Sequence, residues 1–85
     1  MLSKNKRNDI EILSEMLSLA QKGIKKTHLM YQTNVSYSQL VYYTDFLVEK
    51  GFIDIKNGGQ NNIYRITEKG KNFLKDVENL MDQIK

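Results

Sequence analysis

Five polar residues, Ser36-Tyr37-Ser38-Gln39 and Tyr42, have the types and spacing to contact a nucleic acid. A glutamine amide can bond an adenine edge, and a serine hydroxyl can bond a base or a phosphate. The tyrosines can bond phosphate through their hydroxyls or pack on a sugar or a thymine methyl. No arginine or lysine occurs from Tyr37 to Glu49, and Asp45 would repel phosphate or accept from cytosine. The pattern predicts contacts of modest specificity, without guanine readout.

Basic residues that could hold phosphates lie on both sides of this stretch: Lys25, Lys26, Lys56, Arg65 and, in an N-terminal arm, Lys4, Lys6 and Arg7. The chain has a net charge of +3, and the whole excess lies in residues 1–34. This charge permits an anionic partner without requiring one. An alternative is that Lys56 and Arg65 are solvated charges that protect the edge of a sheet.

The sequence contains few residues that could support catalysis or bind a metal ion. The chain has no cysteine and one histidine, which excludes disulfides, thiolate metal sites and an imidazole cluster. His28 could pair with Thr27 or Ser36, but no carboxylate stands in a recognisable relation to it and no nucleophile motif surrounds it. Gly58-Gly59 is not followed by the Lys-Ser/Thr of a phosphate-binding loop, so it predicts a turn. We expect a protein that is not an enzyme and uses no cofactor or metal.

Length and composition fit one compact domain. The 85 residues are 40% hydrophobic and 27% charged, as in globular proteins. No apolar run approaches the roughly 20 residues that cross a bilayer, and residues 1–7 form no leader with an apolar segment behind it. We expect a cytoplasmic protein without membrane contact.

Two helices are predicted in the first part of the chain. Apolar residues at helical spacing span residues 9–22, and Gly23 follows where a left-handed cap costs least. Thr27 is predicted to cap a short second helix. The polar run 32–34 then favours a tight turn.

A third helix is predicted from Tyr37 to Lys50, with Ser36 as its N-cap and Gly51 closing it. This helix must bury a stripe against the first two. The residues predicted to lie in that stripe rather than to contact a partner are Tyr43, Phe46 and Leu47.

After residue 51 the spacing of the apolar residues changes from helical to alternating. Alternating residues predict two strands at 52–56 and 63–66. The segment 57–62 between them is rich in glycine and asparagine, which tolerate positive φ and favour a hairpin with a polar tip.

A last helix is predicted from Thr67 to the end of the chain. Its apolar residues follow the four-three alternation of a coiled-coil seam, at Phe73, Leu74, Val77, Leu80, Met81 and Ile84. About five turns of apolar stripe exceed what one small core can cover, which favours dimerisation. The alternative is a monomer in which the stripe completes the core.

Three segments resemble known proteins. The segments 47–53 and 64–70 resemble the junctions that leave the recognition helix and the wing in winged-helix regulators. Met30-Tyr31-Gln32-Thr33-Asn34-Val35-Ser36-Tyr37 is similar to the helix-turn-helix of small archaeal winged helix-turn-helix DNA-binding proteins, which dimerise through a C-terminal antiparallel coiled-coil helix. The resemblance covers residues 9–85.

The resemblance implies an α+β, mostly α fold: a winged helix-turn-helix of three helices and a two-stranded wing, with a long C-terminal dimerisation helix. Residues 1–66 would form the DNA-binding region, with 1–8 as a flexible basic arm, and 67–85 the dimerisation helix of the same compact domain. The helix 37–50 would enter the major groove of double-stranded DNA, with Asp45 also facing the groove, and the wing 56–65 would follow the backbone. The residues expected to contact DNA are Lys25, Lys26, Ser36, Tyr37, Ser38, Gln39, Tyr42, Lys56, Asn57, Gln60, Asn61 and Arg65.

The expected protein is a homodimeric transcription regulator or nucleoid-associated protein. One rival is a protein-protein interaction module that keeps the scaffold, favoured by the lack of arginine in the third helix. Another is a ligand-sensing repressor, which requires a cavity. Salt separates the first two, because a phosphate-driven complex weakens steeply as ions are added.

Overall fold

The computed structural model describes the backbone of residues 8–58 and 61–84, and their side chains except at 57, 58 and 61. The elements follow in the order α1 (Asp9–Leu19), η1 (Ala20–Lys22), β1 (Ile24–Lys25), α2 (Lys26–Thr33), α3 (Tyr37–Glu49), β2 (Ile53–Gly58), β3 (Asn61–Ile66) and α4 (Glu68–Gln83). The predicted order of three helices, a hairpin and a terminal helix is confirmed.

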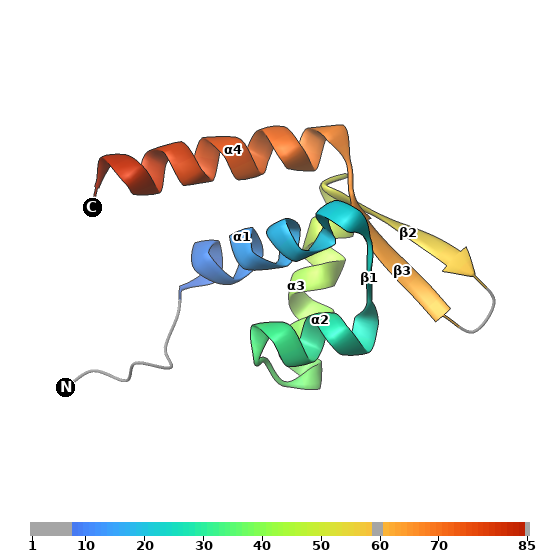
Figure 1. Ribbon diagram of the computed structural model, residues 1–85. Helices are drawn as coiled ribbons and strands as arrows, with labels where there is room; N and C mark the ends of the chain where they lie inside the picture. The colour runs from blue at the N-terminus through green and yellow to red at the C-terminus, as the bar shows by residue number, and fades with distance from the viewer. Residues whose placement is uncertain (1–7, 59–60, 85) are drawn as a thin grey trace.

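Helix α1 lies at the centre of the molecule, with α4 on one side and α2 and α3 on the other (Figure 1). Helix α4 runs along α1 in the opposite direction, and the sheet stands at the end of the helical layer where α1 finishes. Apolar side chains from α1, α2, α3, α4 and the sheet meet in one core, whose most buried members include Met16, Leu17, Leu29, Leu40, Leu47 and Ile53. In the described part of the chain, no helix has the length and apolar character to cross a membrane.

Side-chain caps fix where the helices begin. Ser36 caps α3 and Thr67 caps α4, as predicted, and each side chain accepts a hydrogen bond from a backbone N–H three residues on. Asn8 caps α1 in the same way, with Glu11 completing a capping box. The cap at Asn8 was not predicted.

The second helix differs from its prediction at both ends. It begins at Lys26, and its N-cap residue Lys25 makes no side-chain cap, so Thr27 is not the cap. The helix also continues through Thr33, where a turn was expected. Thr33 is fully buried, and its hydroxyl donates to the Leu29 carbonyl at 2.7 Å, which satisfies it inside the helix. Asn34 then ends the helix in the left-handed conformation at φ 57°.

The sheet has three strands in the order β1-β3-β2, all antiparallel. The two-residue strand β1 was not predicted, because it is too short for an alternating pattern and its partner lies forty residues away. Pairing of Ile53 with Ile66 sets the register of the hairpin, and both side chains are buried. The opposite face of the sheet points away from the core and carries Lys25, Asp54, Lys56, Ile63 and Arg65.

A close approach joins the hairpin to α4. The Phe52 carbonyl accepts a hydrogen bond from the Thr67 N–H at 3.0 Å, and the Phe52 and Phe73 rings stack 4.4 Å apart. A Cβ at Gly70 would overlap the Phe52 carbonyl oxygen. Only glycine therefore allows this junction to close.

The predicted core is confirmed for Tyr43 and Leu47 but not for Phe46. Tyr43 is 7% exposed and Leu47 fully buried, whereas Phe46 is 36% exposed. Phe46 lies on the edge of α3 that faces the first turn of α1, where Ile10 is also 43% exposed. Neither side chain is fully covered by another element of the described chain.

Candidate nucleic-acid interface

The first turn of α3 presents the polar residues singled out in the sequence. Tyr37, Ser38 and Gln39 are all exposed. However, the Gln39 Oε1 accepts the Ser36 N–H at 3.0 Å, and the Ser36 Oγ accepts the Gln39 N–H at 3.2 Å. An adenine contact uses both ends of a glutamine amide. Gln39 would therefore have to give up its part in the capping box to read a base in that way, a constraint that the Ser36-x-x-Gln39 spacing signals in the sequence.

The exposed face of α3 becomes acidic toward its C-terminal end. Ser38, Tyr42, Asp45 and Glu49 recur at steps of four, three and four, and all are exposed. Their stripe lies opposite the buried residues of the helix and contains no cation. The first half of α3 is thus compatible with a phosphate backbone, whereas the second half repels it.

A cation is fixed beside the first turn of α3. The Lys26 ammonium donates a hydrogen bond to the Tyr37 hydroxyl at 3.2 Å and lies 4.9 Å from the centre of the Tyr37 ring. This hydrogen bond is the main reason that the pKa of Lys26 is raised; burial opposes it, and the Asp45 charge adds to it. Lys26 therefore stays protonated at neutral pH. Both residues were predicted from the sequence to contact DNA, but their contact with each other was not predicted.

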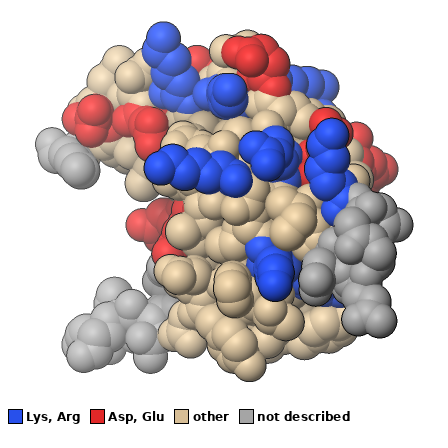
Figure 2. Space-filling model, turned by 45° about the vertical axis from the view of Figure 1, so that its right-hand side comes forward, with Lys and Arg blue, Asp and Glu red and all other residues tan. Residues whose placement is uncertain are grey.

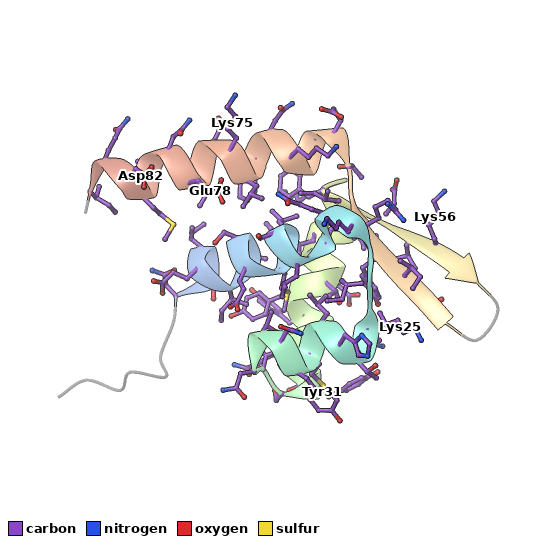
Figure 3. The ribbon with its side chains drawn as sticks, in the orientation of Figure 1. Lys25, Tyr31, Lys56, Lys75, Glu78 and Asp82 are labelled. Carbon is purple, nitrogen blue, oxygen red and sulfur yellow. The ribbon has the colours of Figure 1, made fainter. Side chains whose placement is uncertain are left out.

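The outer face of the sheet supplies three more cations. Lys25 and Lys56 both pair with Ile63, from strands on either side of it, so their side chains flank it on one face. Arg65 lies two residues further along β3 on the same face, opposite Asp54. Figure 2 shows Lys and Arg side chains across the middle of this side of the molecule, with carboxylates toward its edges. Lys25 and Lys56 come from separate strands of the sheet (Figure 3).

Gly23 makes room for Arg65. Gly23 has φ 86° and ψ 133°, a conformation that L side chains rarely adopt. A Cβ at this position would lie 3.1 Å from the Arg65 Nη2 and 3.1 Å from the Ile63 Cγ2. The guanidinium thus packs against the Gly23 backbone, which holds it on the outer face of the sheet. From the sequence, Gly23 was predicted only to cap a helix.

Several predicted contacts are only partly described. Ser36 is exposed and its hydroxyl lies 3.3 Å from that of Ser38, and Tyr42 is 65% exposed. Gln60 lies outside the described residues, as do the side chains of Asn57 and Asn61 and the arm residues Lys4, Lys6 and Arg7. Tyr31 was not predicted to make contacts, yet it is 75% exposed at the outer side of α2 (Figure 3). Within residues 8–58 and 61–84, no three His, Cys, Asp or Glu side chains gather where they could hold a metal ion.

The predicted seam of α4 divides in two. Leu74 and Val77 are 3% and 7% exposed, so the protomer itself already buries them. Phe73 and Met81 are half-buried, whereas Leu80 and Ile84 are 58% and 75% exposed. A partner would therefore meet only the half of the stripe that α1 leaves uncovered.

Sequence comparisons give the family and two relatives. The model of a family described as winged helix-turn-helix matches residues 6–85. The uncharacterized protein MJ0287 of Methanocaldococcus jannaschii is 32% identical over 78 residues, which cover 91% of this chain and 76% of that protein. MJ0290 of the same organism is 32% identical over 74 residues, which cover 86% of this chain but only 33% of that protein.

Solved structures with the same fold include archaeal and bacterial proteins. Sso10a-2, a DNA-binding protein from Sulfolobus solfataricus, is 30% identical with a TM-score of 0.81, over 89% of this chain and 80% of that chain. A MarR-family transcriptional regulator from Rhodococcus sp. RHA1 is 23% identical with a TM-score of 0.75, over 84% of this chain and 54% of that chain, a likeness of fold alone. The predicted fold and the resemblance to small archaeal winged-helix proteins are confirmed.

Proposed function

This chain belongs to the winged helix-turn-helix family, and on that premise we propose that it binds double-stranded DNA as a transcription regulator or nucleoid-associated protein. The DNA-binding protein Sso10a-2, which is 30% identical, supports the DNA-binding part. The proposal adds a binding mode, in which α3 enters the major groove and the hairpin follows the backbone.

One observation carries the proposal. The cations of the outer sheet face, Lys25, Lys56 and Arg65, together with Lys26, which contacts the first turn of α3, are called the cationic strip. Lys25 and Lys26 are adjacent in the chain, and the contact of Lys26 with Tyr37 joins the strip to the helix. Lys25, Lys56 and Arg65 face outward from the sheet. Phosphates along one DNA strand could thus contact the strip while Tyr37 and Ser38 approach base edges or sugars.

The acidic half of α3 limits how the helix can dock. Asp45 and Glu49 would face phosphates if the helix lay flat in the groove along its whole length. Entry by the N-terminal end keeps both carboxylates further from the backbone. With Gln39 engaged in its capping box, few side chains remain to read bases, so we expect most of the affinity to come from phosphate contacts.

We propose that α4 joins two copies in an antiparallel arrangement. The exposed Leu80 and Ile84 supply apolar contact area. Charge is also divided along the helix: after Glu68, the first half carries Lys69, Lys71 and Lys75, and the second half carries Asp76, Glu78 and Asp82. Figure 3 shows Lys75, Glu78 and Asp82 along this helix. Antiparallel pairing sets opposite charges together, whereas parallel pairing opposes like charges.

The test of DNA binding is titration of a fluorescent mixed-sequence duplex at two salt concentrations. Four cations per protomer give about eight phosphate contacts in a dimer, so affinity should fall by about 10³ to 10⁵ between roughly 50 and 200 mM salt. Absence of binding at the lower concentration, or binding that does not respond to salt, would overturn the proposal.

The dimer is tested separately by Leu80→Glu, which places a charge in the exposed half of the seam and should yield monomers in sedimentation experiments. The matched control is Asn79→Glu, which adds the same charge one residue away on the solvent face of α4. A Leu80→Glu protein that stays dimeric would show that the seam is wrong.

A protein-interaction role is the second candidate, because Tyr42, Asp45 and Glu49 give α3 an acidic and aromatic face that suits a basic protein. Salt-insensitive or absent DNA binding in the same titration would favour it.

A further inference from the structure

A pocket of about 220 Å³ lies between the first turn of α1 and the middle of α3. Its lining is almost wholly apolar or aromatic, and consists of Asp9, Ile10, Leu13, Tyr42, Tyr43 and Phe46. Three of its apolar side chains, Ile10, Tyr42 and Phe46, are 43%, 65% and 36% exposed. Phe46, which departs from the predicted core, and the exposed Ile10 therefore meet at this pocket.

The pocket has one carboxylate among its lining residues and no cation. The Tyr43 hydroxyl donates to the Asp9 Oδ1 at 2.8 Å, which fixes the carboxylate at the rim. A carboxylate accepts about four hydrogen bonds, so Asp9 retains acceptor capacity beyond this one. Asp9 also lies in the first turn of α1, where the helix dipole offsets part of its charge.

The aromatic walls suit a cation as well. Tyr42 and Tyr43 pack edge to face, with ring centres 5.2 Å apart. The Lys50 ammonium lies 5.7 Å from the centre of the Phe46 ring, so this ring already takes part in a cation–π contact, and a ligand ammonium would replace Lys50 or use the other face of the ring. Aromatic faces beside a carboxylate are the usual surroundings of an ammonium ligand. An anion would be repelled by Asp9, and a neutral hydrocarbon would gain nothing from it.

We propose that this pocket binds a small lipophilic cation, an ammonium group that carries one aromatic or branched aliphatic substituent. The ammonium group lies against Asp9 and the ring of Phe46, and the substituent fills the space over Leu13 and Ile10. The volume is below the roughly 300 Å³ at which pockets accept drug-sized ligands, so the ligand is a small one.

The pocket also shares a residue with the DNA-binding surface. Tyr42 lines it and lies on the exposed stripe of α3. A bound cation that holds the Tyr42 ring against the pocket removes it from that stripe. We therefore expect the ligand to lower DNA affinity, and this second step alone rests on the proposed function.

The test is an NMR titration of the ¹⁵N-labelled full chain with 2-phenylethylammonium, with phenylacetate as the anionic counterpart of similar size. We expect saturable shifts at Asp9, Ile10, Tyr42 and Phe46 with a dissociation constant on the order of 1 mM, the affinity of a ligand with about ten heavy atoms. Phenylacetate should produce no saturable shifts.

Two variants test separately the contributions of the Asp9 carboxylate and of the aromatic wall to ligand binding. Asp9→Asn keeps an oxygen that can accept the Tyr43 hydrogen bond and should weaken binding about fivefold. Phe46→Ala should weaken it about three- to tenfold, because it removes a ring from the wall. The matched control Asp54→Asn removes a carboxylate from the sheet and should leave ligand affinity unchanged.

The proposal is overturned if the cation causes no saturable shifts, if phenylacetate binds equally well, or if Asp9→Asn and Asp54→Asn behave alike. It is also overturned if the pocket resonances shift with protein concentration instead, since a second copy would then cover this face. If the ligand binds without changing DNA affinity, only the regulatory step is wrong. If the ligand binds but the protein does not bind DNA, the ligand site is supported and the proposed function is wrong.

Discussion

The outer face of the sheet and the exposed face of α3 are both open to solvent but carry opposite charge. The sheet face presents Lys25, Lys56 and Arg65 against a single carboxylate, Asp54. The α3 face presents Asp45 and Glu49 and no lysine or arginine. In this protein the element that would attract DNA is therefore distinct from the element that would read it.

The difference between the two faces also has a structural basis. The sheet holds its cations in fixed register, because strand pairing sets Lys25 and Lys56 on either side of Ile63. Polar groups at the start of α3 are instead partly used by the helix itself, since the Ser36 and Gln39 side chains cap it. Such a division favours binding that depends strongly on salt and weakly on sequence.

The largest effect is expected when the cations of the sheet face are removed. In a dimer, the triple substitution Lys25→Gln, Lys56→Gln, Arg65→Gln removes about six phosphate contacts, which should lower DNA affinity at least ~10³-fold and flatten the salt slope by about five. Fluorescence anisotropy over a series of salt concentrations measures both quantities. A triple variant that keeps the slope of the wild-type protein would contradict the assignment of phosphate binding to the sheet.

An intermediate effect is expected at Gly23, which holds Arg65 on that face. Gly23→Ala imposes a strained φ that costs roughly 1–3 kcal/mol of folding stability and crowds the guanidinium. We expect a lower melting temperature together with a salt slope reduced by about two, because each protomer of a dimer misplaces one arginine.

Gly51→Ala is the matched control for this prediction. Gly51 also has a positive φ, of 79°, but a Cβ there would approach only the Lys69 Cδ, at 3.8 Å. The control should lose stability to a similar degree and keep its salt slope. If both variants keep the slope, Gly23 has a purely structural role.

Local signals made most of the fold predictable. The caps at Ser36 and Thr67 depend on residues three positions away. The turns at Gly23 and Gly51 depend on one residue's freedom at positive φ. Such features depend on only a few neighbouring residues, so they could be predicted from the sequence alone.

Features that depend on distant partners were not predictable. Strand β1 exists because Ile24 pairs with Tyr64, forty residues away. The division of the α4 stripe depends on how α1 lies beneath it, which leaves Leu80 exposed while Leu74 is buried. Phe46 has the right spacing for the core, but none of the described elements covers that edge of α3 completely. For the candidate site, the cations could be identified from the sequence. The contact of Lys26 with Tyr37 and that of Arg65 with Gly23 could not be predicted.

The smallest effect is expected on the α3 face, where Asp45→Asn should strengthen DNA binding. The Tyr37 hydrogen bond is the main reason that the pKa of Lys26 is raised, and the Asp45 charge adds a smaller contribution, so this charge offsets part of the attraction at the end of the cationic strip. Removing it from both protomers should raise affinity about two- to fivefold, the range of an exposed charge pair. Glu68→Gln removes one carboxylate from the exposed first turn of α4 and serves as the control. An equal gain in both variants would mean that net charge alone governs affinity. A gain confined to Asp45→Asn would mean that α3 approaches the DNA closely enough for its own carboxylates to oppose binding, and would place the acidic half of the helix at the edge of the interface.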